Sequence, residues 1–312
     1  MQLFDAAATR DALPLDRLIA ALREAFAADD ITVPLRHVHE VAGAAAQPPA
    51  FTSLIMPAWQ AGRAYGVKIV NIAPGNAARG LPGLHASYLL HDAATGVPIA
   101  LLDGDQITAR RTAAASALAA SFLARDDASR LLVVGAGRVA GLLPAAYRCV
   151  RGIERVTVWA RSAKAATALV DDLRADGFDA HAATDLPQAA GAADVVSCAT
   201  LASAPVICGR WLRDGSHLDL IGSFTPAMRE ADDDCFRGSR LFVDTDEALV
   251  KSGELLGPIA RGVISAADVQ ATLADLCRGT QRGRQSTTER TVFKSVGSAL
   301  EDLVAAMLVA GA

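Results

Sequence analysis

The stretch VVGAGRVAG, residues 133–141, constrains the fold of this chain more than any other segment. It follows an apolar, strand-like run and opens a segment with helical spacing, so its glycines lie at a turn from strand to helix. The pattern G-x-G-x-x-A falls on Gly135, Gly137 and Ala140. The first glycine allows a tight turn, the second lets the backbone approach a pyrophosphate, and the small third residue lets helix and strand pack closely. Because a helix N-terminus also attracts phosphate, we predict a nucleotide site here.

The segments around this loop alternate between strand and helix patterns. Apolar runs at 130–137, 155–161, 193–200, 217–223 and 240–245 are separated by helical segments, and a further helix is expected at 265–279. Such alternation implies right-handed βαβ crossovers and a parallel sheet. We therefore predict an α/β chain in which residues 113–288 form a Rossmann-type, doubly wound dinucleotide-binding domain.

The first hundred residues follow a different pattern. A helical segment at 13–30 precedes strand-like segments at 33–41, 51–59 and 64–72, and residues 83–104 are typical of two strands joined at a turn. A long Ala-rich helix then begins at Asp105. We predict a second, α+β domain for substrate binding and dimerisation, formed by residues 1–112 together with 289–312.

Composition excludes several classes of protein. A net charge of -4 and a pI near 5.9 argue against a nucleic-acid surface. No apolar run reaches the roughly 18 to 20 residues of a membrane span, and the N-terminus lacks the apolar core of a signal peptide. The five cysteines include no C-x-x-C pair, which favours reduced thiols in the cytoplasm. His37 and His39 share one face of a strand without a third ligand at matching spacing, so we expect no metal site.

The residues after the second strand of the predicted Rossmann domain indicate which dinucleotide binds. A carboxylate there would bind the ribose of NAD, whereas an arginine accommodates the 2′-phosphate of NADP. The strand ends in VWARSAK, with Arg161, Ser162 and Lys164 and no acid. A solvated basic turn would have the same composition, but we expect NADPH as the cofactor ahead of NAD(H).

Three cations of the first domain stand among apolar or small residues. They are Arg36, Lys68 and Arg111, and none has an acidic neighbour in the sequence. Any one of them could form a structural salt bridge or extend to solvent. Together they would suit a small carboxylate, which an arginine binds through two hydrogen bonds. Lys68 could also act as an acid near a reacting nitrogen, because the pKa of a lysine shifts readily.

Four motifs resemble the ornithine cyclodeaminase/μ-crystallin family, from about residue 33 onward. They are GVKIVNIAPGNAARGLPG, LLHDAATGVPIALLDGDQITARRTAAASALAASFLA, VVGAGRVAG and FKSVGSALEDL. The resemblance implies a nicotinamide cofactor, an amino or imino acid substrate and a homodimer built by the first domain. It also matches residues to the family's cofactor-contacting positions, with Arg138 and Val139 in the phosphate loop, Thr200 after the fourth strand and Ser295 near the nicotinamide.

The same resemblance assigns the substrate side of the site. Arg36 and Arg111 match the carboxylate-binding arginines and Lys68 the active-site lysine. The cyclodeaminases carry an aspartate after the fifth strand, where this chain has Phe224 in IGSFTPAMRE. A phenyl ring cannot accept a proton, although it can line an apolar pocket.

Phe224 therefore favours the reductase branch of the family, which reduces cyclic ketimine carboxylates such as Δ1-pyrroline-2-carboxylate to L-proline with NAD(P)H. Ornithine cyclodeaminase, which converts L-ornithine to L-proline and ammonia, remains an alternative. An alanine dehydrogenase-like enzyme and a non-catalytic, NADPH-dependent binding protein for small ligands are further alternatives. The size of the substrate ring stays open.

Overall fold

The computed structural model describes residues 1–43 and 50–312. The chain forms two compact units, the first comprising Met1–Arg111 with Ser298–Ala312 and the second Thr112–Gly297. The first boundary lies one residue from the expected one. The expected return to the first unit at residue 289 is corrected to 298, because Thr291–Lys294 is a strand of the second unit's sheet.

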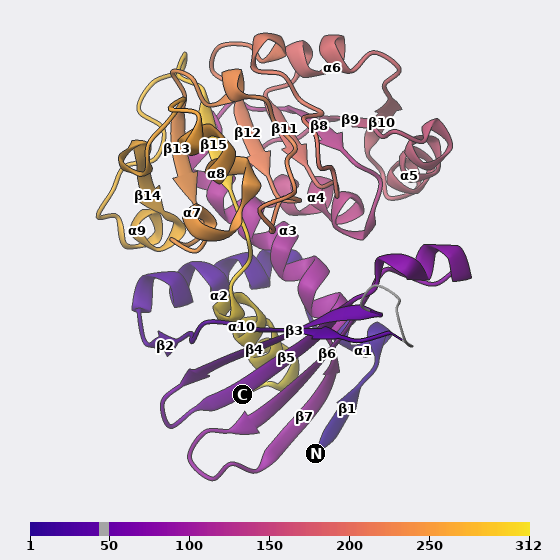
Figure 1. Cartoon of the computed structure of the whole chain (residues 1–312), viewed down its shortest axis with the longest axis vertical. Helices are drawn as coiled ribbons and strands as arrows, with labels where there is room; N and C mark the ends of the chain where they lie inside the picture. The colour runs from indigo at the N-terminus through magenta and orange to yellow at the C-terminus, as the bar shows by residue number, and fades with distance from the viewer. Residues whose placement is uncertain (44–49) are drawn as a thin grey trace. The chain divides into compact units, whose positions relative to one another are not determined.

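The first unit contains a mostly antiparallel sheet with strands in the order β1-β7-β6-β5-β4-β2, and β3 also pairs with β4 (Figure 1). Its strands are β1 Gln2–Phe4, β2 Ile31–Thr32, β3 His37–Val41, β4 Phe51–Gln60, β5 Ala64–Ile72, β6 Leu84–Asp92 and β7 Pro98–Asp103. The sequence predicts the long hairpins well, because their side chains alternate between a buried and a more exposed face. The short strand β1 carries too few residues for such a pattern.

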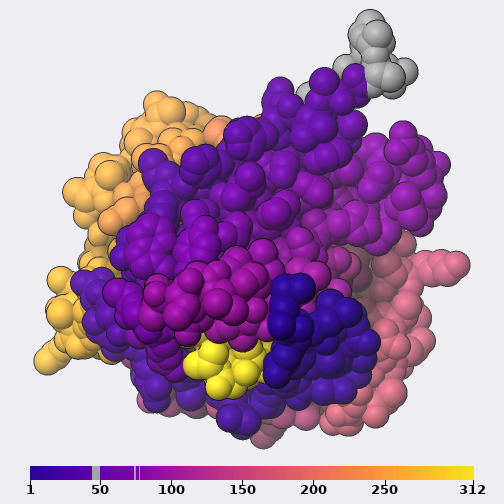
Figure 2. All heavy atoms as spheres, turned by 90° about the horizontal axis from the view of Figure 1, so that it is seen from below, coloured from indigo at the N-terminus to yellow at the C-terminus, as the bar shows by residue number. Residues whose placement is uncertain are grey.

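Helices cover one face of this sheet. The first unit contains α1 Ala6–Asp11, α2 Leu15–Ala28 and α10 Ala299–Ala310, and a 3-10 turn spans Pro74–Arg79. Helix α10 contacts β4, β5, β6, β7 and α2, and it is buried along nearly its whole length. Figure 2 shows its end (yellow) at the surface between the N-terminal residues (indigo) and the strands of the sheet (purple to magenta).

The second unit contains a parallel sheet with strands in the order β10-β9-β8-β11-β12-β15-β13-β14. Its strands are β8 Arg130–Val134, β9 Arg155–Trp159, β10 Asp179–Ala182, β11 Val195–Cys198, β12 His217–Leu220, β13 Arg240–Val243, β14 Val269–Thr272 and β15 Thr291–Lys294. Numbered within the unit, the first strands follow the order 3-2-1-4-5, which is that of a doubly wound dinucleotide-binding sheet. The predicted Rossmann-type fold is confirmed.

The helices of the second unit follow the predicted alternation with one correction. They are α4 Arg138–Arg148, α5 Ala163–Ala175, α6 Leu186–Ala192, α7 Ala248–Lys251, α8 Gly253–Ala260 and α9 Leu273–Arg278, and the unit boundary lies within α3 Gly104–Leu123. The helix expected at 265–279 is wrong in its first half, where Val269–Thr272 pairs with β13 as an edge strand. Thr272 and Asp275 form a capping box, so α9 begins only there. Within residues 1–43 and 50–312, no helix is both long and apolar enough to cross a membrane.

Candidate active site

The predicted cofactor residues of the second unit, and the predicted substrate-pocket residue Phe224, all follow the carboxyl ends of adjacent parallel strands. Gly135, Gly137, Arg138 and Val139 come after β8, Arg161 and Ser162 after β9, Thr200 after β11, Phe224 after β12 and Ser295 after β15. These strands are neighbours in the order β9-β8-β11-β12-β15. In doubly wound sheets ligands bind outside this edge, where the strand order reverses. The topology therefore gathers residues that are up to 160 positions apart along the chain.

The glycine loop has the geometry that a pyrophosphate requires. Gly135 has a φ of 125°, and a Cβ there would lie 2.6 Å from the carbonyl oxygen of Ala199. A Cβ on Gly137 would meet nothing within 4 Å, so this position borders open space. Helix α4 begins directly after Gly137, and the N–H groups of its first turn have no acceptor within the helix. This loop fits the phosphates of a dinucleotide.

A hollow lies beside the end of β9. Its lining includes Trp159, Arg161, Pro187, Pro205 and Trp211, so an exposed guanidinium stands next to aromatic and proline surfaces. Ser162 caps helix α5 by accepting a hydrogen bond from the Ala165 N–H. A flat heterocycle could stack in such a hollow while Arg161 contacts a phosphate beside it.

Two further predicted residues, Thr200 and Ser295, form hydrogen bonds to β12 or to the segment that follows it. Thr200 is half-buried, and both its N–H and its hydroxyl donate to Oε1 of Glu230 at 2.7 Å. Ser295 is 5% exposed, and its N–H donates to the carbonyl of Leu220 on β12. Phe224 is half-buried in the segment that follows β12.

In the first unit, Lys68 and Arg111 meet at a shared acid. The ammonium of Lys68 on β5 lies 2.7 Å from Oδ2 of Asp302, and Nε of Arg111 lies 2.9 Å from Oδ1 of the same carboxylate. Nη1 of Arg111 also lies 2.7 Å from Oε2 of Glu301. All four side chains are buried, and both acids belong to the first turn of α10. The unusual lysine in strand β5 therefore faces α10 and is paired there.

Burial moves the pKa of Lys68 toward neutral pH, and the pairing with Asp302 limits this shift. Burial lowers the pKa of Lys68 to about 8, against the opposing effect of Asp302. Burial alone would raise the pKa of Asp302, but Lys68 and Arg111 hold it below its ordinary value. The cluster thus combines a firmly ionised carboxylate with a lysine that can exchange a proton near physiological pH.

The sequence reasoning missed the acids of this cluster and the tyrosine beside it. Tyr88 on β6 pairs with Lys68, is buried, and its hydroxyl has no hydrogen-bond partner within the described residues. A Cβ on Gly66 would lie 2.0 Å from that hydroxyl, so only glycine fits beneath Tyr88. Two adjacent acids inside the otherwise apolar segment SALEDLVAAMLVA were the signal that could have revealed Glu301 and Asp302.

Arg36 lies half-buried in the segment between β2 and β3, and the contacts described above do not include it.

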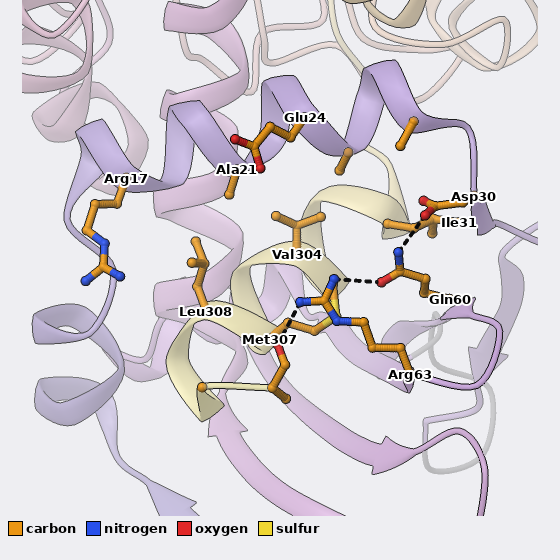
Figure 3. A pocket seen from close by; sticks show the side chains of 14 residues that line it. Arg17, Ala21, Glu24, Asp30, Ile31, Gln60, Arg63, Val304, Met307 and Leu308 are labelled. Carbon is orange, nitrogen blue, oxygen red and sulfur yellow. Dashed lines mark hydrogen bonds between the residues drawn. The ribbon is translucent and has the colours of Figure 1, made fainter.

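A separate hollow of about 440 Å³ in the first unit lies between α2 and α10 (Figure 3). There Arg63 donates to Gln60 and to the carbonyl of Ala312, and Gln60 donates to Asp30. None of the predicted site residues lines this hollow. Among the residues that the structure describes, no group of three His, Cys, Asp or Glu side chains is placed to hold a metal ion.

Comparison with known proteins now identifies the family. The model of the "Ornithine cyclodeaminase/mu-crystallin family" matches residues 10–311. The Delta(1)-pyrroline-2-carboxylate reductase of Paracoccus denitrificans is 48% identical over 265 residues, which cover 84% of each chain. The structure of Delta(1)-pyrroline-2-carboxylate reductase from Thermococcus litoralis, in complex with NADH and L-proline, superposes with a TM-score of 0.94 at 34% identity and covers 100% of this chain and 97% of that one.

An archaeal alanine dehydrogenase dimer with bound NAD superposes with a TM-score of 0.91 at 30% identity, over 100% of this chain and 95% of that one. The family model and these two solved structures span both units and all four motifs that carry the resemblance. The chain belongs to the ornithine cyclodeaminase/mu-crystallin family.

Proposed function

We propose that this protein reduces a cyclic ketimine carboxylate of the Δ1-pyrroline-2-carboxylate type to the corresponding cyclic amino acid, L-proline in that case, with a nicotinamide cofactor. The observation that carries the proposal is the likeness to the T. litoralis reductase over the whole chain. The residue Phe224 adds to it, because a phenyl ring cannot perform the proton transfer of the aspartate that the resemblance places there in cyclodeaminases.

The chemistry requires one hydride and one proton. A bound nicotinamide would supply the hydride that adds to the imine carbon and would itself be oxidised. Lys68 donates the proton to the imine nitrogen, so that the C=N double bond becomes a CH–NH single bond. Asp302 keeps the ammonium of Lys68 in a fixed position, which reduces the entropy lost on reaching the reactive arrangement.

Arginines would bind the carboxylate of the substrate. Arg111 is anchored by Glu301 and Asp302, and a planar guanidinium is suited to carboxylates because it can bind one through two parallel hydrogen bonds. Arg36 is the second arginine that we assign to this carboxylate. Phe224 would contact the apolar edge of the ring.

We also propose that NADPH is preferred to NADH. The support is the exposed Arg161 beside the hollow at the end of β9, together with the absence of an acid in the segment RSAK that follows this strand. The glycine loop, Arg138 and Val139 would hold the pyrophosphate, with Thr200 and Ser295 nearer the nicotinamide.

A homodimer formed through the first unit is a further part of the proposal. Because Lys68 points toward α10, alternation along β5 directs Tyr65, Val67 and Ile69 to the opposite face of the sheet. Ile55 on β4 lies next to Ile69 there, and Ile69 is 41% exposed. An apolar sheet face of this kind suits a second copy of the chain. A cytoplasmic location is proposed from the five cysteines, an odd number without a C-x-x-C pair, which suits a reducing compartment.

The test is the loss of NADPH absorbance when the purified protein meets freshly prepared Δ1-pyrroline-2-carboxylate. Consumption with L-proline as the product supports the proposal. NADPH binding without consumption refutes it for this substrate. Release of ammonia from L-ornithine would instead favour the cyclodeaminase, and reaction with pyruvate and ammonia the alanine dehydrogenase.

A further inference from the structure

A buried glutamate joins the loops at the carboxyl edge of the second unit's sheet. Glu230 lies after β12 and is fully buried. Its Oε1 accepts hydrogen bonds from the N–H and the hydroxyl of Thr200, and its Oε2 accepts one from the N–H of Gly222, all at 2.7 Å. One carboxylate therefore holds the loop after β11 and the loop after β12 together.

The backbone at these loops is packed too closely for a side chain at Gly222 or at Gly135. A Cβ on Gly222 would lie 1.8 Å from the carbonyl oxygen of Thr200 and 2.7 Å from Glu230 Oε1. In turn, a Cβ on Gly135 would lie only 2.6 Å from the carbonyl oxygen of Ala199. The glycine loop, the Thr200 loop and the Gly222 loop are thus stacked in contact, in the same order as β8, β11 and β12. A shift of any one of them would be transmitted to the next.

Glu230 is itself fixed from behind. Glu254, at the start of α8, accepts hydrogen bonds from the N–H groups of Glu230 and Ala231 at 2.7 and 2.9 Å. The carbonyl of Glu230 accepts from the N–H groups of Val206 and Ile207. The buried ammonium of Lys294, which donates to Leu220, is the cation that favours the charged form of both glutamates. Nothing in the proposed chemistry uses this arrangement directly, although it is built from charges buried in the core, which are costly unless paired.

We propose that Glu230 is a positioning residue for the cofactor: its carboxylate clamps Thr200 to Gly222, and so holds in register the glycine loop and the segment that carries Phe224. The inference rests on the proposed function only in naming a nicotinamide cofactor as the ligand of this edge. Its test therefore measures cofactor binding and needs no turnover of an imine.

The clamp is strongest with the ionised carboxylate, since the two backbone N–H groups can only donate and hydrogen bonds to a charged acceptor are stronger than those to a neutral one. Burial raises the pKa of Glu230 to about 7, and Lys294 opposes this shift. The titratable groups that face it are Lys294 on β15, Glu254 on α8 and Cys198 on β11. The clamp is therefore at full strength above about pH 7 and weakens as the pH falls below that value, so cofactor affinity should weaken in the same direction.

The experiment compares Glu230→Gln with Asp219→Asn by calorimetric titration with NADH, which lacks the titratable 2′-phosphate. Asp219 is a matched control, because it is an equally buried carboxylate of the same sheet whose hydrogen bonds come from Ser116 on α3, Tyr147 on α4 and Ser197 on β11. A glutamine must point its amide N–H₂ at one of the donors. We expect Glu230→Gln to raise the Kd for NADH at pH 8 at least tenfold and to abolish its pH dependence near 7.

In Asp219→Asn the Kd should change less than twofold and the pH dependence near 7 should persist, even where the melting temperature falls as far as in Glu230→Gln. A folded Glu230→Gln protein with wild-type affinity and pH profile would overturn the proposal. If Glu230→Gln yields no folded protein, Glu230→Asp decides. Its carboxylate is one methylene shorter and cannot reach both loops, so an unchanged Kd in that variant also overturns the clamp.

Discussion

Replacing Asp302 with asparagine tests the proposed proton donor most directly. Asparagine keeps the shape of the side chain and removes the charge that lies 2.7 Å from the Lys68 ammonium. At that distance, with an effective dielectric constant of about 20, two unit charges attract each other by about 6 kcal/mol. A pKa unit corresponds to about 1.4 kcal/mol, so even a quarter of this energy lowers the pKa of Lys68 by about one unit.

The expected result is a shift of the alkaline limb of activity. A general acid must be protonated to act, so turnover of the native protein should fall as the pH rises above about 8, the pKa of Lys68. In Asp302→Asn this limb should move to about pH 7 or below, while the Kd for NADPH stays within twofold. Initial rates with Δ1-pyrroline-2-carboxylate between pH 6 and 9.5 measure the shift. Breaking the buried pair should also lower the free energy of unfolding by about 3 kcal/mol.

Glu301→Gln is the control. Glu301 lies in the same helical turn as Asp302 and pairs with Arg111. It raises the pKa of Lys68 less than Asp302 does. The alkaline limb of activity in Glu301→Gln should therefore shift by clearly less than the limb in Asp302→Asn. A folded Asp302→Asn protein with an unshifted limb would refute the assignment of this limb to Lys68.

Three other predictions concern Lys68, Arg161 and Gly66. Lys68→Met should reduce turnover about 100-fold or more and leave the Kd for NADPH within twofold, since proton transfer by a positioned acid contributes about that much; a native rate would remove Lys68 from the mechanism. Arg161→Ala should raise the Kd for NADPH about tenfold and leave that for NADH unchanged, whereas Lys164→Ala, at an exposed position in the first turn of α5, should change neither. Equal losses for both cofactors would contradict the 2′-phosphate contact. Gly66→Ala should lower the free energy of unfolding by about 2 kcal/mol in urea titrations, because the new methyl group would lie 2.0 Å from the Tyr88 hydroxyl; native stability would show that Tyr88 moves aside at little cost.

The parts of the fold that local pattern governs were predictable. The glycine loop and the alternation of strands and helices indicate the doubly wound sheet, because each βαβ unit has its own periodicity in the sequence. Strand β14 was not predictable, because Val269–Thr272 is short and lies between residues that also favour a helix. The position of β15 between β12 and β13 depends on pairing across the sheet, which no local signal encodes.

In the candidate site, too, residues with a local sequence signal were predictable, and residues whose roles depend on distant contacts were not. Lys68 could be singled out because a lysine in an apolar strand needs a partner, but Asp302 lies more than two hundred residues farther along the chain. Glu230 was not predicted at all, since its role comes from two loops that only the parallel sheet brings together. The roles of Arg36, Ser295 and Phe224 remain predictions that come from the family resemblance.

The late strand β15 has a consequence for synthesis on the ribosome. It lies between β12 and β13, although it follows both of them, and β14 as well, in the chain. While translation has reached only β14, the nascent sheet lacks the strand that joins its two parts, and the first unit lacks α10, whose Asp302 pairs with an arginine 191 residues earlier. Neither core can close until these last elements emerge. We therefore expect the growing chain to expose apolar strand edges for most of its synthesis and to need chaperones during that interval.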